Sequence, residues 1–343
     1  MLTKSNLFKF LVHFSFFCFL SIVCTEARVY KCVDKDGKIL FSNTLCPEDT
    51  KEQSFKLKES YTINDEINDE ILPDVVPDVS GDNKATNESF KSDVLEINIA
   101  QEKITLHPAE ISRIHQGISF VSDYFKNVYQ ISPNSYVNLK IFGKHGDFMS
   151  YQHKLIGKIY SDSGIFLPRI GEALVNGSKY RNRVVAISIH EASHALIQPA
   201  GYRIPSWVNE GIAEYFETIE ISETQVLFNP QYDRHSEIAQ LFKEKKLTSL
   251  LEYFGLSNKV WKNRNLVEDR TSRSIAWSLV HFLMSSKQGT ETIMKIMNNF
   301  KIDDESPSMY IVNNSYPGGL NVLEQRWHEY LKSTPSAHAF NKN

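Results

Sequence analysis

Two histidines four residues apart, with a glutamate between them, are the residues of this chain best suited to chemistry. They occur in His190-Glu191-Ala192-Ser193-His194. In a helix, this spacing places both imidazole rings on one face. Shortly downstream, Trp207-Val208-Asn209-Glu210-Gly211 supplies a carboxylate from a second predicted helix. Two imidazoles and one carboxylate, with a fourth position left to water, are typical of a catalytic zinc site. We therefore predict that His190, His194 and Glu210 bind one zinc ion.

Further glutamates flank the predicted ligands. Glu191 is placed to act as general base on the zinc-bound water, whose pKa the metal lowers from about 15.7 to about 7. Glu214 follows Glu210 by one helical turn, so we predict that it orients a ligand histidine through the second ring nitrogen. Glu217 is the alternative third ligand, less favoured because we place it away from the face of Glu210. A His-Glu-x-x-His string also arises by chance in roughly a few per cent of such chains.

The composition is that of a protein with a packed core. The chain has 343 residues, of which 41% are hydrophobic, enough for one substantial domain and a smaller one. The formal net charge is −3 and no basic block occurs, so nucleic acid is not an expected partner. No pattern indicates the oligomeric state.

The N-terminus has the organisation of an export signal. Lys4 and Lys9 precede an apolar run from Phe10 to Val23, and Thr25-Glu26-Ala27 offers a cleavage site after Ala27. The run is shorter than the ~20 residues that a spanning helix needs. We expect residues 1–27 to be removed and the protein to be exported, either to the periplasm or as a secreted protein. Membrane contact is expected only if this segment is retained.

Residues 28–47 carry the signals of a small β-hairpin module. Tyr30–Val33 and Ile39–Ser42 flank an Asp36-Gly37 turn. After cleavage only Cys32 and Cys46 remain, and two cysteines in an exported segment are expected to form a disulfide. A bridge across about 15 residues stabilises the fold by roughly 3 kcal/mol. Two free thiols are the alternative, which would fit a cytosolic protein.

The same segment resembles a small bacterial envelope domain of unknown function. The resemblance rests on Tyr30, Cys32, Asp36-Gly37, Phe41-Ser42 and Cys46-Pro47. It implies a location in the cell envelope more than an activity.

The next segment, residues 48–92, is predicted to be a disordered acidic linker. Acidic residues far outnumber lysines, Asn-Asp-Glu-Ile occurs twice in succession, and Pro73 and Pro77 interrupt any helix. A stretch so poor in apolar side chains cannot offset the entropy lost on ordering. An acidic tail that binds a partner is the alternative.

The main domain is predicted over residues 93–335, and its class is α+β. Apolar patterns predict strands near Val94–Leu106 and at Tyr136–Phe142, Gly164–Leu167 and Glu172–Val175, with a long amphipathic helix at Ala109–Val128. Beyond Arg181 the patterns are mostly helical, at Arg183–Ile197, Ser206–Thr218, Ser236–Lys245, Ser272–Ser286, Glu291–Phe300 and Leu320–Lys332. A mixed sheet lobe should therefore precede the site, and a helical lobe should follow it.

The motifs of this domain resemble those of the gluzincin metallopeptidases, in particular their thermolysin-like branch. The similar segments are His190–His194, Trp207–Phe216, Ala276–Leu283 and Leu323–Tyr330. The resemblance implies a zincin-like fold with an active-site helix, the three zinc ligands named above, and Glu191 as the base. It also implies a sheet whose edge strand pairs with an extended substrate.

One position departs from the family pattern. Relatives often carry a tyrosine near the start of the later helix, where it can stabilise an oxyanion, but this chain has Arg273. Arginine can donate hydrogen bonds to a developing negative charge, yet it cannot give up a proton at neutral pH. Tyr202, His281 and Tyr316 are the other candidate oxyanion donors, although such residues are more often structural.

These observations predict an exported zinc metallopeptidase that hydrolyses a peptide bond in a peptide or protein substrate. The first alternative is an inactive envelope binding or scaffold protein with a vestigial zinc site. The second keeps the metal but changes the substrate, for example to a peptidoglycan cross-bridge.

Overall fold

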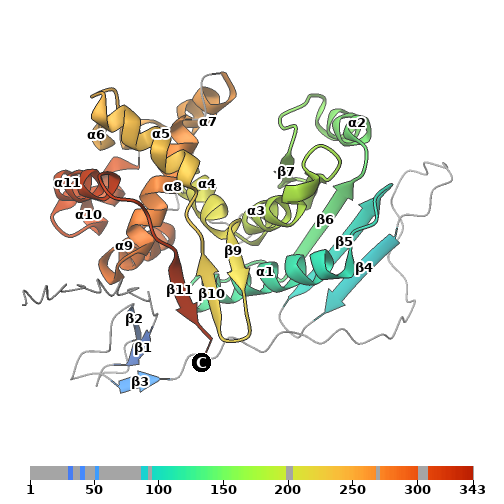
Figure 1. Ribbon diagram of the computed structural model, residues 1–343, viewed down its shortest axis with the longest axis horizontal. Helices are drawn as coiled ribbons and strands as arrows, with labels where there is room; N and C mark the ends of the chain where they lie inside the picture. The colour runs from blue at the N-terminus through green and yellow to red at the C-terminus, as the bar shows by residue number, and fades with distance from the viewer. Residues whose placement is uncertain are drawn as a thin grey trace, which may run out of the picture.

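The computed structural model describes residues 30–33, 39–42, 51–53, 86–91, 95–197, 204–267, 271–299 and 308–342 (Figure 1). Within these ranges, no helix combines the length and the apolar character needed to cross a membrane. The predicted signal segment 1–27 lies outside them.

The N-terminal module is a small antiparallel sheet. Strand β1 (Tyr30–Val33) pairs with β2 (Ile39–Ser42), which confirms the predicted hairpin, and also with β3 (Lys51–Gln53). Strand β3 falls in the segment predicted to be a disordered linker, so that prediction is wrong there. The strand pairs through its backbone, and acidic side chains do not prevent such pairing. Cys32 lies in β1, but Cys46 lies outside the described residues, so the disulfide stays a prediction.

The main sheet has five strands in the order β4-β5-β6-β8-β7. Its three central strands are parallel, and both edge strands are antiparallel to their neighbours. The strands are β4 (Thr86–Lys91), β5 (Glu96–Glu102), β6 (Tyr136–Phe142), β7 (Gly164–Leu167) and β8 (Glu172–Asn176). Strand β4 falls in the predicted linker, which is therefore wrong there as well, and the domain begins earlier than expected.

Alternation along the strands gives the sheet two covered faces. On one face, Val137, Leu139 and Ile141 of β6 belong to the main core with helices α1 (Pro108–Asn127) and α3 (Val184–Ile197). On the other face, a smaller cluster joins Phe142 and Leu174 to Phe148 of α2 (His145–Ile156). Figure 1 shows α2 and α1 on opposite sides of the sheet.

Local signals explain why α1 starts where it does. Pro108 occupies the first turn, and the side chain of Glu110 accepts a hydrogen bond from the His107 amide at 2.8 Å. The His107 ring accepts from the Ala109 amide in return, at 3.1 Å. This reciprocal cap satisfies amides that the helix itself leaves unpaired.

The part of the chain that follows α3 is mainly helical, which completes the α+β class predicted above. Its helices are α4 (Ser206–Phe216), α5 (Tyr232–Lys243), α6 (Leu250–Gly255), α7 (Asn258–Val267), α8 (Thr271–Met284), α9 (Lys287–Asn299), α10 (Met309–Ser315) and α11 (Gly319–Leu331). A small antiparallel sheet of β9 (Ile219–Ile221), β10 (Gln225–Phe228) and β11 (His338–Asn341) was not predicted. Strand β11 lies beyond the predicted domain end at residue 335.

Helices α4 and α8 touch through their backbones. A Cβ atom on Gly211 of α4 would lie 2.6 Å from the carbonyl oxygen of Ala276 in α8 and 2.7 Å from a methyl carbon of Val280. Only glycine permits this approach without displacing α8. The contact fixes the position of Glu210 relative to residues near the start of α8.

Candidate metal centre

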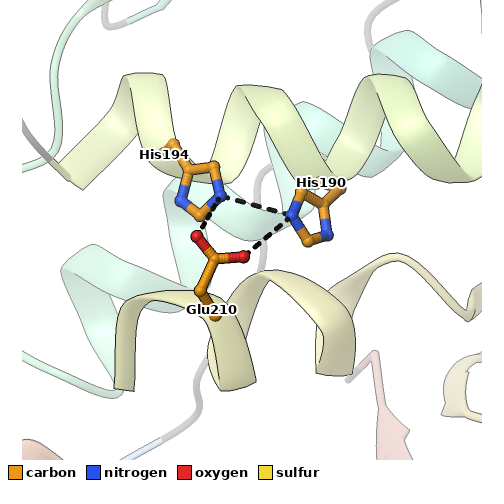
Figure 2. Close-up of side chains that lie close together, drawn as sticks. All are labelled: His190, His194 and Glu210. Carbon is orange, nitrogen blue, oxygen red and sulfur yellow. Dashed lines mark hydrogen bonds and ion pairs between the residues drawn. The ribbon is translucent and has the colours of Figure 1, made fainter. Parts of the chain in front are cut away.

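The two histidines and the glutamate predicted to bind zinc come together in the structure (Figure 2). The His190 and His194 Nε2 atoms are 3.3 Å apart. The Glu210 oxygens lie 3.6 Å from His190 Nε2 and 3.7 Å from His194 Nε2. Ligands held about 2.0–2.1 Å from a tetrahedral zinc ion lie about 3.3–3.4 Å from one another. The three side chains could therefore bind a metal ion with shifts of only a few tenths of an ångström.

Helix α3 carries both histidines on a buried face. The rings of His190 and His194 are about one-twentieth exposed, and α4 presents Glu210 opposite them. Burial lowers the pKa of His194 to about 4, which favours the neutral ring that metal binding requires. Burial acts to raise the pKa of Glu210, but Arg273, His194 and His190 together outweigh it and hold the pKa well below its usual range. The carboxylate is thus ionised.

Glu217, and not Glu214, contacts a candidate ligand histidine. Its Oε2 atom lies 2.9 Å from His190 Nδ1. Burial acts to lower the pKa of His190, but its contacts with Glu210 and Glu217 outweigh burial and raise the pKa to about 10. Once deprotonated, a ring that donates from Nδ1 to Glu217 has its Nε2 lone pair free to bind a metal ion. Arg183 contacts the other oxygen of Glu217 at 2.9 Å. The predicted role of Glu214 is wrong because this carboxylate meets Arg273 and Arg234, whereas Glu217 meets His190.

Replacing Glu217 by glutamine is expected to weaken zinc binding about 10- to 100-fold, because the ligand ring loses its charged acceptor. Competition with a chromogenic chelator would measure the dissociation constant. Glu220→Gln is the matched control, since Glu220 is an exposed glutamate of β9. Equal zinc affinity in both variants would contradict the assigned contact.

Glu214 instead anchors two arginines. Its Oε1 atom lies 2.9 Å from Arg273 Nε and 2.9 Å from Arg234 Nη2, and the side chain is fully buried. Its second oxygen, Oε2, is buried and has no hydrogen-bond partner. Glu214 therefore links α4 to α5 and α8 but does not contact the ligand histidines.

The side chain of Glu191, on α3, lies beside Gly164, the first residue of the edge strand β7. A Cβ atom on Gly164 would lie 2.8 Å from Glu191 Oε1, so the absence of a side chain at residue 164 leaves space for the carboxylate. Burial raises the pKa of Glu191 to about 7. The carboxyl group does not belong to the group of three candidate ligands.

Of the candidate oxyanion donors, the structure brings Arg273 to the site. Its Nη2 atom lies 2.7 Å from Glu210 Oε2 and 3.3 Å from His190 Nε2. His281 is buried elsewhere, with its Nδ1 3.0 Å from the Tyr330 hydroxyl, so its prediction as an oxyanion donor is wrong. Tyr316 contacts Arg326 beside α11, so its prediction is wrong too. Tyr202 lies outside the described residues.

Sequence reasoning missed the arginines that balance this acidic site. Arg183 precedes α3 and Arg234 lies on α5, and neither forms a motif with the ligands. The spacing of Glu210, Glu214 and Glu217 did contain a usable signal. Residues separated by four and by seven positions share one face of a helix.

Comparisons with known proteins match two segments of the chain to families. Residues 184–302, which contain the candidate metal ligands, match a family described as "Protein of unknown function (DUF1570)". Residues 16–65 match a family described as "Domain of unknown function (DUF4124)". The search of curated proteins gave no match.

Among solved structures, the chain is similar to an aminopeptidase N family protein from Idiomarina loihiensis, with 10% identity and a TM-score of 0.30. The similarity covers 74% of this chain and 42% of that one, so the chain spans less than half the length of the solved protein.

Proposed function

We propose that the protein is a zinc-dependent metallopeptidase that hydrolyses peptide bonds. The observation that carries this proposal is the group formed by His190, His194 and Glu210, whose donor atoms have the spacing of zinc ligands, with Glu191 beside it. Imidazole and carboxylate are the ligand types of catalytic zinc sites. Three protein ligands leave one position for water or substrate.

The side chains around the site have separable roles in this reaction. When bound, zinc supplies a Lewis acid that activates water and polarises the scissile carbonyl. Glu191 takes the proton of the attacking water and passes it to the leaving amine. A carboxyl pKa of about 7 suits both transfers near neutral pH. Glu217 holds the ring of His190 through Nδ1, so that the ligand nitrogen stays in place.

The substrate in this proposal is a peptide or protein segment in extended form. Strand β7 is an edge strand of the sheet and begins at Gly164, next to Glu191. An extended peptide can pair with such an edge through main-chain hydrogen bonds. The substrate backbone would then run past the base. Export to the periplasm or beyond is part of the proposal and rests on the N-terminal sequence.

An inactive scaffold protein remains the second candidate, and one observation favours it. The guanidinium of Arg273 lies 2.7 Å from Glu210 Oε2, where a cationic group acts against metal binding. A protein of this kind would keep the fold and tolerate the loss of Glu191.

The first experiment measures the zinc content of the purified mature protein and of its Glu210→Ala variant. We expect about one zinc ion per chain in the wild type and a sharp reduction in the variant. Glu220→Ala is the control for removing an exposed glutamate from the neighbouring strand. Negligible zinc in folded wild-type protein that never met a chelator would refute the peptidase proposal and favour the scaffold.

A further inference from the structure

Arg273 makes contacts that a metal ion would also make. Its Nη2 atom lies 2.7 Å from Glu210 Oε2 and 3.3 Å from His190 Nε2, which belong to two of the three candidate ligands. Its Nε atom lies 2.9 Å from Glu214 Oε1. One guanidinium thus bridges a candidate ligand and a buried carboxylate outside the ligand group.

The guanidinium and a metal ion bound through these two atoms are too close for both to keep their positions. His190 Nε2 and Glu210 Oε2 are 3.6 Å apart, and Arg273 Nη2 lies 3.3 Å from the first and 2.7 Å from the second. Consider an ion about 2.0–2.1 Å from both His190 Nε2 and Glu210 Oε2. It would lie within about 3.4 Å of Arg273 Nη2, even if the ion and Nη2 were on opposite sides of the line that joins the two ligand atoms. Two cationic centres at that distance repel each other strongly.

A second position for the guanidinium exists on Glu214. The Oε2 atom of this carboxylate is buried and has no hydrogen-bond partner, while Oε1 already accepts from Arg273 Nε. Side-by-side nitrogens of a guanidinium match the two oxygens of a carboxylate. A rotation about the Nε contact would move Nη2 from Glu210 to Glu214 Oε2. That movement would satisfy the unpaired oxygen.

We propose that Arg273 competes with the metal ion for Glu210 and transfers its Nη2 contact to Glu214 Oε2 when the ion binds. Arg273 is therefore a positioning residue that sets the metal affinity of the site. This inference rests on metal binding in the proposed function but not on peptidase activity. It assigns to Glu214 the role of receiving the displaced guanidinium.

The test compares Arg273→Gln with Arg234→Gln, after both proteins have been stripped of metal by a chelator. Arg234 contacts the same oxygen of Glu214 but has no contact with Glu210 or His190, so it controls for the loss of one positive charge. Zinc dissociation constants come from chelator competition, and unfolding midpoints are measured with and without zinc.

For Arg273→Gln we expect zinc affinity to rise about tenfold or more, because the competing hydrogen bond and charge are gone. We also expect a lower unfolding midpoint without zinc and a larger increase on adding zinc than in the wild type. Arg234→Gln should lower both midpoints and change zinc affinity less than about threefold. Unchanged or weaker zinc binding by Arg273→Gln would overturn the inference while leaving the metal site of the wild type intact.

Other outcomes separate the two proposals. If the wild type binds no zinc but Arg273→Gln does, the competition is supported and the proposed function is refuted. If neither protein binds zinc, both proposals fail. A crystal structure of the zinc-bound wild type gives a test that needs no variant: Arg273 should contact both oxygens of Glu214, and a retained contact between Nη2 and Glu210 Oε2 would overturn the inference.

Discussion

Replacing Glu191 by glutamine is expected to lower peptidase turnover by about 10²–10⁴-fold, the usual contribution of a general acid–base. Glutamine has nearly the shape of glutamate but cannot accept the proton of the attacking water. The carboxyl group lies beside Gly164 and outside the candidate ligands, so zinc content should stay near that of the wild type. Turnover is measured with a quenched peptide library and zinc by elemental analysis.

Two results would contradict this assignment of Glu191. Full activity in Glu191→Gln would remove its role as base, and loss of zinc together with activity would make it a ligand. Glu220→Gln serves as the control for an exposed glutamate that touches neither group. If neither wild type nor variant cleaves peptides while both bind zinc, cell-wall fragments are the next substrates to test, and the scaffold candidate follows.

Acid is expected to destabilise the domain through a buried histidine cluster formed by His235, His281 and His338. The His281 and His338 rings lie 4.2 Å apart, and Tyr330 contacts His281 and packs edge-on to His235. Burial lowers the pKa of all three, that of His338 to about 4. A positive charge on His338 or His235 would lower the pKa of His281 further, so protonation of one ring opposes protonation of its neighbour.

The sign of the effect follows from these lowered values. An unfolded histidine, with a pKa near 6.5, binds protons before the folded one does. The stability that His338 contributes is complete above pH ~6.5 and is lost as the pH falls from there toward about 4. Between pH 7 and pH 5, His338 alone should cost about 2 kcal/mol of unfolding free energy.

Urea unfolding at pH 7 and pH 5 measures this loss. In His338→Gln the difference between the two pH values should shrink by about 2 kcal/mol, whereas His153→Gln, which changes an exposed histidine of α2, should behave like the wild type. An equal pH dependence in all three proteins would show that His338 is protonated in the folded state at pH 5.

The elements that position the ligands could be predicted from the sequence because their signals are local. Helix α3 starts one residue after its predicted start and ends as predicted, and β6 and β7 have the predicted bounds. Apolar residues recur in these elements with a regular spacing because one face or both faces are buried. That spacing can be recognised within a short stretch of sequence.

The elements that were missed depend on distant partners. Strand β4 joins the sheet by pairing with β5 at its edge, and β11 pairs with β10 more than a hundred residues earlier in the chain. Backbone pairing of this kind leaves little trace in side-chain pattern. The exchange of roles between Glu214 and Glu217 has another cause. It depends on which partner each carboxylate meets, His190 or Arg273, and helical spacing alone does not decide this.

The close approach of α4 and α8 also predicts how the sequence can change during evolution. There is no room for even a methyl group between Gly211 and the backbone at Ala276. A larger residue at 211 would separate a candidate ligand from the arginine that contacts it, and only a shift of α8 as a whole could compensate. Residue 211 should therefore stay glycine in proteins that conserve Glu210 and Arg273, and it should vary where that pair is lost.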